Sequence, residues 1–372
     1  MLNRRDALKV SGVAALGLVA ADKSFAKADS PQPAISVAGY PYDRVQAIKD
    51  GGVGLDKAQV TFSNENIYRL NDLAFGPEKY HEVTELGLIP YVTKYINEGF
   101  RGYTLIPVFI SRTFRHRNIY VHVDSGIEKP QDLRGRKVGT PGYGASSNTW
   151  IRGMLQDQYG VFPQEMQWIE TTRSSDKAGT VNSSSGGSFQ NGKLSLYLPA
   201  DFPLVQGPPG VDESELLLSG GCDALVTAIT PKAFEEGNPK IRQLFTQPKA
   251  AEQAYYRDTG LFPIMHVVAI RSDAAKEKPW LAAAVFQMYS QAKQLAYGNL
   301  AGTTVLRTSL PWAADEYEET RQLMGDDYWR YGIEANREEL ELIMRYTHEQ
   351  GLVKRLGGFE EMFDPSTIGL AG

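Results

Sequence analysis

The densest group of chemically capable side chains is the hexapeptide Ser111–His116, Ser-Arg-Thr-Phe-Arg-His, which follows the apolar run Leu105–Ile110. A guanidinium fork pairs bidentately with a carboxylate, so Arg112 and Arg115 are candidates to bind an acid. His116 could be a general acid or base, because the pKa of free imidazole lies near neutrality. Structural ion pairs, a solvated loop and a structural histidine are the alternative interpretations.

A second candidate for proton transfer, His266, lies inside an apolar segment, between Phe262–Met265 and Val267–Ile270. Burial in such a strand would favour neutral imidazole, and a satisfied core histidine is the alternative. Glu65 and Glu85 begin apolar-patterned segments and are the acidic candidates, although either could cap a helix or face water. Which histidine would act as acid and which as base stays open.

The turn Thr140–Thr149 is rich in glycine and hydroxyl residues, and it connects the strand-like Lys137–Gly139 to a helix-like segment. Backbone N–H groups at a helix start, with the helix dipole behind them, suit a carboxylate. Plain helix capping would need the same residue types. The candidate ligand-binding residues of this region are Tyr143, Ser146, Ser147, Thr149 and Trp150.

Metal and nucleophile motifs are poorly represented in the sequence. The five histidines, at positions 81, 116, 122, 266 and 348, include no pair at helical spacing, and Cys222 is the single cysteine. The sequence contains no Gly-x-Ser-x-Gly and no phosphate-binding glycine motif. We therefore predict no cofactor, and a divalent metal held by residues far apart in the sequence stays open.

Segments typical of strands and helices alternate along the chain, which indicates an α/β fold. Strands are predicted at 35–38, 57–62, 102–109, 119–123, 137–139 and 267–271, and helices at 42–49, 65–73, 280–296 and 337–349. The stretch 174–202 has no sustained apolar period and predicts a long surface loop. Cys222 precedes an apolar run and is predicted to be a core residue.

The N-terminus has the pattern of an export leader: Arg4-Arg5, the apolar run Val10–Ala21 and the small-residue site Ser24–Ala28. The apolar run is too short to span a bilayer, so we expect residues 1–28 to be a removable twin-arginine signal and the product to be periplasmic or secreted. Removal takes away five Lys or Arg and two Asp, which changes the net charge from −5 to −8. That acidity disfavours nucleic acid, and the 372-residue chain is long enough for roughly two domains. No other segment is apolar enough for an integral membrane protein.

Five strings, in this order, resemble the 4,5-dihydroxyphthalate decarboxylase family over roughly residues 36–366: Pro107–His116, Ile119–Val121, Asp132–Pro141, Thr149–Gly153 and Thr259–His266. The resemblance implies the two-lobed α/β fold of type 2 periplasmic solute-binding proteins, with a ligand cleft between the lobes. It also implies a first lobe of 34–119 plus 272–372 and an inserted second lobe of 120–271. The strands near 119–123 and 267–271 would then carry the chain between the lobes.

The same resemblance implies decarboxylation of a hydroxylated aromatic dicarboxylate, giving protocatechuate and carbon dioxide from 4,5-dihydroxyphthalate. Arg112, Arg115 or the Ser146–Ser147 turn would hold the carboxylate that remains. His116 and His266, with Glu65 or Glu85 as partner, would take the phenolic proton and protonate the ring carbon. The alternative is an exported receptor that binds an aromatic or other carboxylate, without catalysis, for an ABC-type or other membrane transporter.

Overall fold

The computed structural model describes residues 33–372 except 79, 172 and 174–193. The expected leader and most of the loop predicted at 174–202 therefore lie outside the described residues. The described remainder of that loop, residues 194–202, contains no helix or strand. None of the helices in the described ranges is long and apolar enough to cross a membrane.

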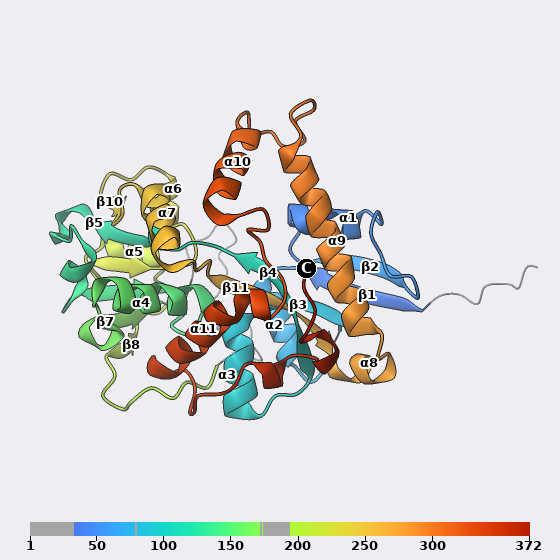
Figure 1. The fold of residues 1–372 in the computed structure, drawn as a ribbon. Helices are drawn as coiled ribbons and strands as arrows, with labels where there is room; N and C mark the ends of the chain where they lie inside the picture. Colours follow the sequence, from blue (N-terminus) through green and yellow to red (C-terminus); the bar gives the residue numbers. More distant parts are fainter. Residues whose placement is uncertain (1–32, 79, 172, 174–193) are drawn as a thin grey trace, which may run out of the picture. The chain divides into compact units, whose positions relative to one another are not determined.

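The first sheet has five strands in the order β2-β1-β3-β11-β4 (Figure 1). They are β1 (Ala34–Gly39), β2 (Gln59–Asn64), β3 (Val83–Gly87), β4 (Tyr103–Arg112) and β11 (Ile264–Arg271). β1 runs parallel to β2 and β3, whereas β11 is antiparallel to both β3 and β4.

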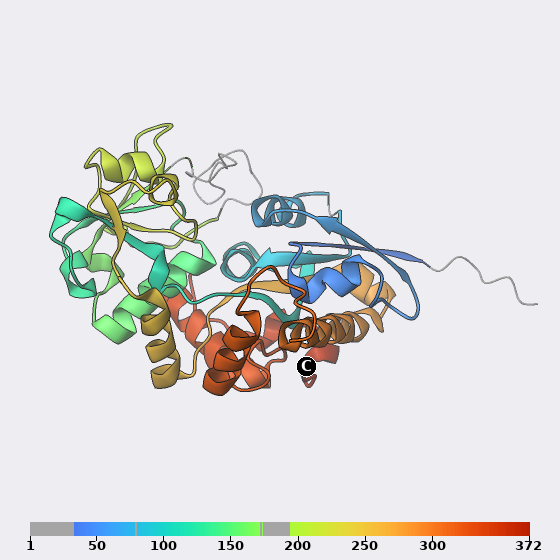
Figure 2. The ribbon, with the colours of Figure 1, turned by 90° about the horizontal axis from the view of Figure 1, so that it is seen from above.

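Both faces of the first sheet are buried. Along β11, Val267 and Ala269 belong to one apolar cluster, whereas Val268 and Ile270 belong to another, because successive side chains of a strand point to opposite faces. Helices α1 (Asp43–Lys49) and α9 (Leu281–Ala301) contribute to the cluster that contains Val268. Both views show these two helices packed beside the first sheet (Figures 1 and 2). Helices α3 (Leu88–Glu98) and α11 (Arg337–Glu349) contribute to the cluster on the other face.

The second sheet has six strands in the order β10-β5-β9-β6-β7-β8. They are β5 (Ile119–His122), β6 (Lys137–Thr140), β7 (Gln167–Glu170), β8 (Leu204–Gln206), β9 (Ala224–Val226) and β10 (Ile241–Gln243). The four strands from β9 to β8 are parallel, and β5 and β10 are antiparallel to their neighbours.

The remaining helices connect or cover the strands. They are α2 (Ile67–Phe75), α4 (Ser146–Tyr159), α5 (Glu213–Leu218), α6 (Lys232–Glu235), α7 (Pro248–Thr259), α8 (Ser272–Glu277) and α10 (Ala313–Met324). α4 packs against α3 and α11, so the first turns of α3 and α4 lie close together. Ser146 at the start of α4 accepts a hydrogen bond from the N–H of Ile89 at the start of α3, at 3.1 Å.

The strand order confirms the two-lobed α/β fold, because β11 follows every strand of the second sheet yet inserts between β3 and β4 of the first. The chain thus passes between the sheets twice. β5 pairs only within the second sheet and β11 only within the first, so neither strand is itself a crossing; the crossings are residues 113–118 and the segment between β10 and β11. The lobe boundaries stay a prediction, and the pairing of β11 favours an upper boundary before Ile264 rather than after Arg271.

Candidate functional site

A cavity of about 280 Å³ opens where the carboxyl ends of parallel strands from both sheets meet. Tyr40 follows β1, Gly87 ends β3, Pro141 follows β6, and Ala228 and Ile229 come shortly after β9. Ligands of open α/β sheets bind beyond the carboxyl ends of the strands. The volume lies near the lower end of the ~300–1,000 Å³ typical of small-molecule sites. The two sheets thus create a site suited to one small molecule.

Three helices present their N-terminal ends to this cavity. The lining residues from these ends are Ile67 and Tyr68 of α2, Pro90 of α3, and Ser146, Ser147 and Asn148 of α4, and Asn71 lines the cavity from inside α2. A helix N-terminus carries partial positive charge. Within the described residues no Asp or Glu lines the cavity, whereas Arg115 and His266 do. This electrostatic environment favours an anionic ligand.

The start of α4 offers free hydrogen-bond donors. The N–H groups of Ser146, Ser147 and Asn148 have no partner among the residues that the structure describes, and no side chain caps the helix. The Asn148 amide holds the preceding turn by donating to Thr140 Oγ1 at 2.9 Å and to the Gly142 carbonyl at 2.7 Å. The turn is therefore fixed while its donors remain available, which is the arrangement that a carboxylate requires.

Arg115 supplies the cation of the cavity. Its Nη1 donates to Asn118 Oδ1 at 3.3 Å and to the Ala228 carbonyl at 3.5 Å, whereas its buried Nε has no partner in the described part of the chain. Burial lowers the pKa of Arg115 to about 10, so the guanidinium stays charged at neutral pH. No ion pair compensates it within the described residues, so an anion in the cavity would gain from this charge.

His266 and Glu85 form a close pair beside the cavity. His266 Nδ1 lies 2.6 Å from Oε1 of Glu85, whose side chain is 2% exposed. Glu85 also accepts hydrogen bonds from the Tyr42 hydroxyl at 2.8 Å and from the Tyr40 N–H at 3.0 Å. A carboxylate that accepts from these donors places the imidazole proton on Nδ1. The lone pair of Nε2 is then free to accept a proton from a ligand.

An irregularity in the sheet gives His266 its orientation. The pairing of β11 with β4 shifts register on both sides of His266, between Ile264 and His266 and again between His266 and Val268. Bulges of this kind re-aim side chains next to functional sites. The Tyr40 ring stacks on the imidazole, with centroids 6.3 Å apart and planes inclined by 17°. The imidazole is thereby held at the wall of the cavity, with 18% of the side chain exposed.

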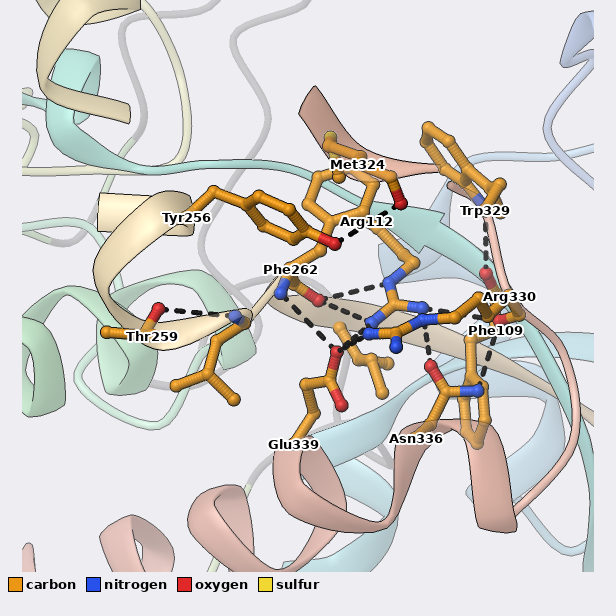
Figure 3. A network of polar contacts seen from close by, with 12 residues as sticks. Phe109, Arg112, Tyr256, Thr259, Phe262, Met324, Trp329, Arg330, Asn336 and Glu339 are labelled. Atoms are coloured by element: carbon orange, nitrogen blue, oxygen red, sulfur yellow. Dashed lines mark hydrogen bonds and ion pairs between the residues drawn. The ribbon is translucent and has the colours of Figure 1, made fainter. Parts of the chain in front are cut away.

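Arg112 does not line the cavity, because its guanidinium is fully buried in a different network (Figure 3). It pairs with Glu339 at 2.8 Å and donates to Asn336 Oδ1 at 2.5 Å. It also donates to the carbonyls of Phe262 and Arg330. Burial lowers its pKa to about 10. These contacts favour the alternative interpretation of Arg112, a structural ion pair, over substrate binding.

His116 and Glu65 are also placed away from the cavity lining. His116 is buried between the rings of Phe245 and Tyr255, and neither ring nitrogen has a partner in the described ranges. Burial lowers the pKa of His116 to about 4, so it is neutral at pH 7. Glu65 is half-buried after β2, and its N–H donates to the Gly39 carbonyl at 3.2 Å. Of the acid–base candidates, only His266 and Glu85 come together, and His266 alone lines the cavity.

Three of the predicted ligand-binding residues, Tyr143, Thr149 and Trp150, do not line the cavity and instead make structural contacts near it. Tyr143 donates its N–H to Glu170 at 2.9 Å, and its ring carries the buried Arg152 guanidinium at 3.7 Å. Trp150 Nε1 donates to the carbonyl of Ile264 at 2.8 Å, beside the β11 irregularity. Thr149 donates its hydroxyl to the Ala145 carbonyl, one turn back. Only Ser146 and Ser147 of the five predicted residues line the cavity.

The remaining candidates for reactive groups are metal-binding clusters and the thiol of Cys222. Across 33–372, apart from the undescribed positions, no cluster of three or more His, Cys, Asp or Glu could hold a metal ion. Cys222 is buried as predicted, and burial raises the pKa of its thiol to about 12.

Comparison with known proteins shows which proteins have sequences similar to this chain. It is 32% identical to 4,5-dihydroxyphthalate decarboxylase of Comamonas testosteroni over 338 residues, which cover 90% of this chain and 97% of that protein. The chain belongs to the 4,5-dihydroxyphthalate decarboxylase family. The Pseudomonas putida protein of the same name is 31% identical over 226 residues, which cover 60% of this chain and 81% of that protein. Residues 108–184 also match the family model described as NMT1/THI5 like.

Solved structures are also similar to this member of the decarboxylase family. The periplasmic aliphatic sulphonate binding protein SsuA of Escherichia coli aligns with a TM-score of 0.48 and 14% identity, over 90% of this chain and 98% of SsuA. The desulfurization enzyme DszB aligns with a TM-score of 0.45 and 17% identity, over 91% of this chain and 98% of DszB.

The structure adds to this decarboxylase-family site several lining residues that the sequence did not single out: Tyr40, Tyr68, Asn71, Pro90 and Asn148. Tyr40 could have been predicted from the sequence as a site residue, because it follows the first predicted strand at the edge of the sheet where ligands bind. Asn71 lies inside α2, and no sequence pattern indicated that it lines the site. Its Oδ1 accepts from the N–H of Gly87 at 3.1 Å, a contact that depends on how α2 meets β3.

Proposed function

We propose that the protein decarboxylates 4,5-dihydroxyphthalate, or a closely similar hydroxylated aromatic dicarboxylate, to the corresponding hydroxybenzoate and carbon dioxide. The two relatives named for this reaction support the substrate class. The observation that carries the proposal is that anion-binding groups and the His266–Glu85 pair meet at one cavity, which no described Asp or Glu lines.

The carboxylate that stays on the ring binds to Arg115 and to the free N–H groups of Ser146, Ser147 and Asn148. Charge-assisted hydrogen bonds from a guanidinium and from a helix start are the strong class of such bonds. Met265, Ile229 and Leu194 contribute an apolar part of the wall. A carboxylate against that apolar wall loses solvation, which costs free energy, whereas uncharged carbon dioxide does not have this cost. The wall therefore favours loss of the carboxylate as carbon dioxide.

The proton transfer begins at Nε2 of His266, which takes the proton of the hydroxyl para to the departing carboxylate. The phenolate pushes electron density to the ring carbon that bears this carboxylate, and that carbon takes up a proton from solvent. The bond to the carboxylate then breaks, carbon dioxide leaves, and the electron pair of that bond restores the aromatic phenolate. His266 returns its proton to the phenolate oxygen. Glu85 stabilises the imidazolium between these two steps.

The test is turnover by the purified protein. With 4,5-dihydroxyphthalate we expect equal amounts of carbon dioxide and protocatechuate, measured with and without added divalent metal. Binding of 4,5-dihydroxyphthalate without either product would contradict the proposal and would favour an exported receptor that delivers its ligand to a membrane transporter.

The proposal extends to location. Arg4-Arg5, Val10–Ala21 and Ser24–Ala28 support export by the twin-arginine route to the periplasm. A reporter joined to residues 1–28 should appear in the periplasmic fraction, and the double substitution Arg4→Lys and Arg5→Lys should keep it in the cytoplasm. Equal export of both fusions would exclude this route.

A further inference from the structure

We infer that Tyr42 is a positioning residue for the reaction, acting through Glu85 on His266, and that Ser111 completes the arrangement. The inference rests on the proposed function for its role in turnover, although the contacts that carry it are independent of that function.

The contacts join three side chains through one carboxylate oxygen, with Ser111 as a neighbour. The Tyr42 hydroxyl donates to Oε1 of Glu85 at 2.8 Å, and the same oxygen lies 2.6 Å from Nδ1 of His266. The Ser111 side chain is a further polar neighbour of the Tyr42 hydroxyl and acts to lower the pKa of Tyr42. Ser111 stands directly opposite His266 in the pairing of β4 with β11. Tyr42 and His266, which lie far apart in the sequence, thus both contact the carboxylate of Glu85.

Glu85 depends on these donors because it is buried without a Lys or Arg partner in the described residues, and its ion pair is with His266. A buried carboxylate that loses a donor pays a desolvation cost or changes its rotamer. Space around it is limited on one side, because a Cβ added at Gly39 would come within 2.9 Å of Oε2. The Tyr42 hydroxyl is therefore the donor that aligns Oε1 with the imidazole.

Tyr42 is itself held rigidly. The Arg44 guanidinium lies 4.1 Å from the centroid of the Tyr42 ring and 3.9 Å from that of Trp329. Arg44 also donates to the carbonyl of Ile110 at 2.8 and 2.6 Å, next to Ser111. Burial, and then the neighbouring Glu85 charge, raise the pKa of Tyr42, so its hydroxyl remains a proton donor at every physiological pH. The hydroxyl is thus available as a fixed, neutral donor.

The experiment compares Tyr42→Phe with Tyr331→Phe. Tyr331 is buried, and its hydroxyl has no partner in the described part of the chain, so Tyr331→Phe controls for removal of a tyrosine hydroxyl inside the protein. For Tyr42→Phe we expect kcat to fall about 10- to 100-fold, as for loss of a hydrogen bond to a charged group. The Kd for phthalate, which cannot react because it lacks the hydroxyls, should change less than about threefold. Ser111→Ala should lower kcat by a smaller factor.

A spectroscopic readout separates this inference from the proposed function. In protein with isotope-labelled histidine, the Nδ1 proton of His266 should give a far-downfield resonance, identified by its loss in His266→Gln. Tyr42→Phe should shift or broaden it, and Tyr331→Phe should leave it unchanged. Identical spectra and turnover in Tyr42→Phe and Tyr331→Phe would overturn the inference. If the wild-type protein has no turnover, the proposed function fails, and the resonance alone decides whether Tyr42 positions the pair.

Discussion

Nδ1 of His266 lies 2.6 Å from Oε1 of Glu85, although 181 residues separate the two in the chain. The fold brings them together because β11 returns from the second lobe and pairs with β3, where His266 stands opposite Gly87, two residues after Glu85. The carboxylate of Glu85 can stabilise a positive charge on His266 during a reaction, although no Asp or Glu among the described residues lines the cavity itself.

Glu85→Gln tests the role of this carboxylate. We expect kcat to fall by about 10²- to 10⁴-fold, because the amide cannot stabilise an imidazolium and can favour the wrong tautomer. The Kd for phthalate should change little. Glu65→Gln is the matched control, since Glu65 does not line the cavity or hydrogen-bond His266. Equal loss of turnover in the two variants would remove Glu85 from the mechanism.

Arg115→Met tests anion binding. We expect the Kd for phthalate, measured by calorimetry, to rise about 10- to 100-fold, which corresponds to the loss of a charge-assisted hydrogen bond. Arg117→Met is the control, because Arg117 is 49% exposed and pairs with Glu252 rather than facing the cavity. Unchanged affinity in Arg115→Met would show that the carboxylate binds elsewhere.

Arg112→Met tests whether Arg112 stabilises the fold or binds the ligand. Removing Arg112 leaves Glu339 buried with the partly exposed Arg330 as its remaining ion-pair partner among the described residues, so we expect a loss of about 3–5 kcal/mol in the free energy of unfolding. Arg330→Met should cost much less, because Arg330 is 33% exposed. Urea unfolding measures both. A stable Arg112→Met variant with weak phthalate binding would restore Arg112 as a ligand-binding residue.

We expect the protonation of His116 to affect the stability of the fold and not the turnover rate. Burial lowers the pKa of His116 to about 4 in the folded protein. A histidine in the unfolded chain has a pKa of about 6.5, so between about pH 4 and pH 6.5 the unfolded state binds a proton that the folded state does not. The free energy of unfolding therefore has its full value with respect to His116 above about pH 6.5, and it decreases by about 1–3 kcal/mol as the pH falls toward 4. His116→Phe should remove that acid-dependent loss and retain turnover. Parallel pH–stability curves for the variant and the wild type, or an inactive variant, would contradict this role.

Local sequence patterns predicted much of the fold. The strands predicted at 35–38, 102–109 and 137–139 correspond to β1, β4 and β6, and the glycine-rich turn at 140–149 does end in helix α4. The strand β3 and helix α3 were not predicted, since Val83–Gly87 is short and mixes apolar with polar residues. Consequently Glu85, expected at the start of a segment where it could cap a helix, lies inside a buried strand.

Two features of the site lay beyond sequence reasoning for a physical reason. Arg112 and Arg115 are three residues apart, but β4 ends at Arg112 and the chain then turns, so that only Arg115 lines the cavity. The two histidines were equivalent in type, and only the long-range pairing of β11 with β3 gives His266 an acidic partner. Contacts between distant segments decide both outcomes, and no local pattern encodes them.

The central claim is that His266 performs chemistry at this cavity, and one comparison tests it most directly. Wild-type protein and His266→Gln are each given 4,5-dihydroxyphthalate, with carbon dioxide release and phthalate affinity measured on the same samples. We predict that the wild type releases carbon dioxide, whereas His266→Gln retains its phthalate affinity within about threefold and loses turnover by at least about 10²-fold. Turnover in His266→Gln equal to that of the wild type, or phthalate binding by both without carbon dioxide from either, would contradict the claim.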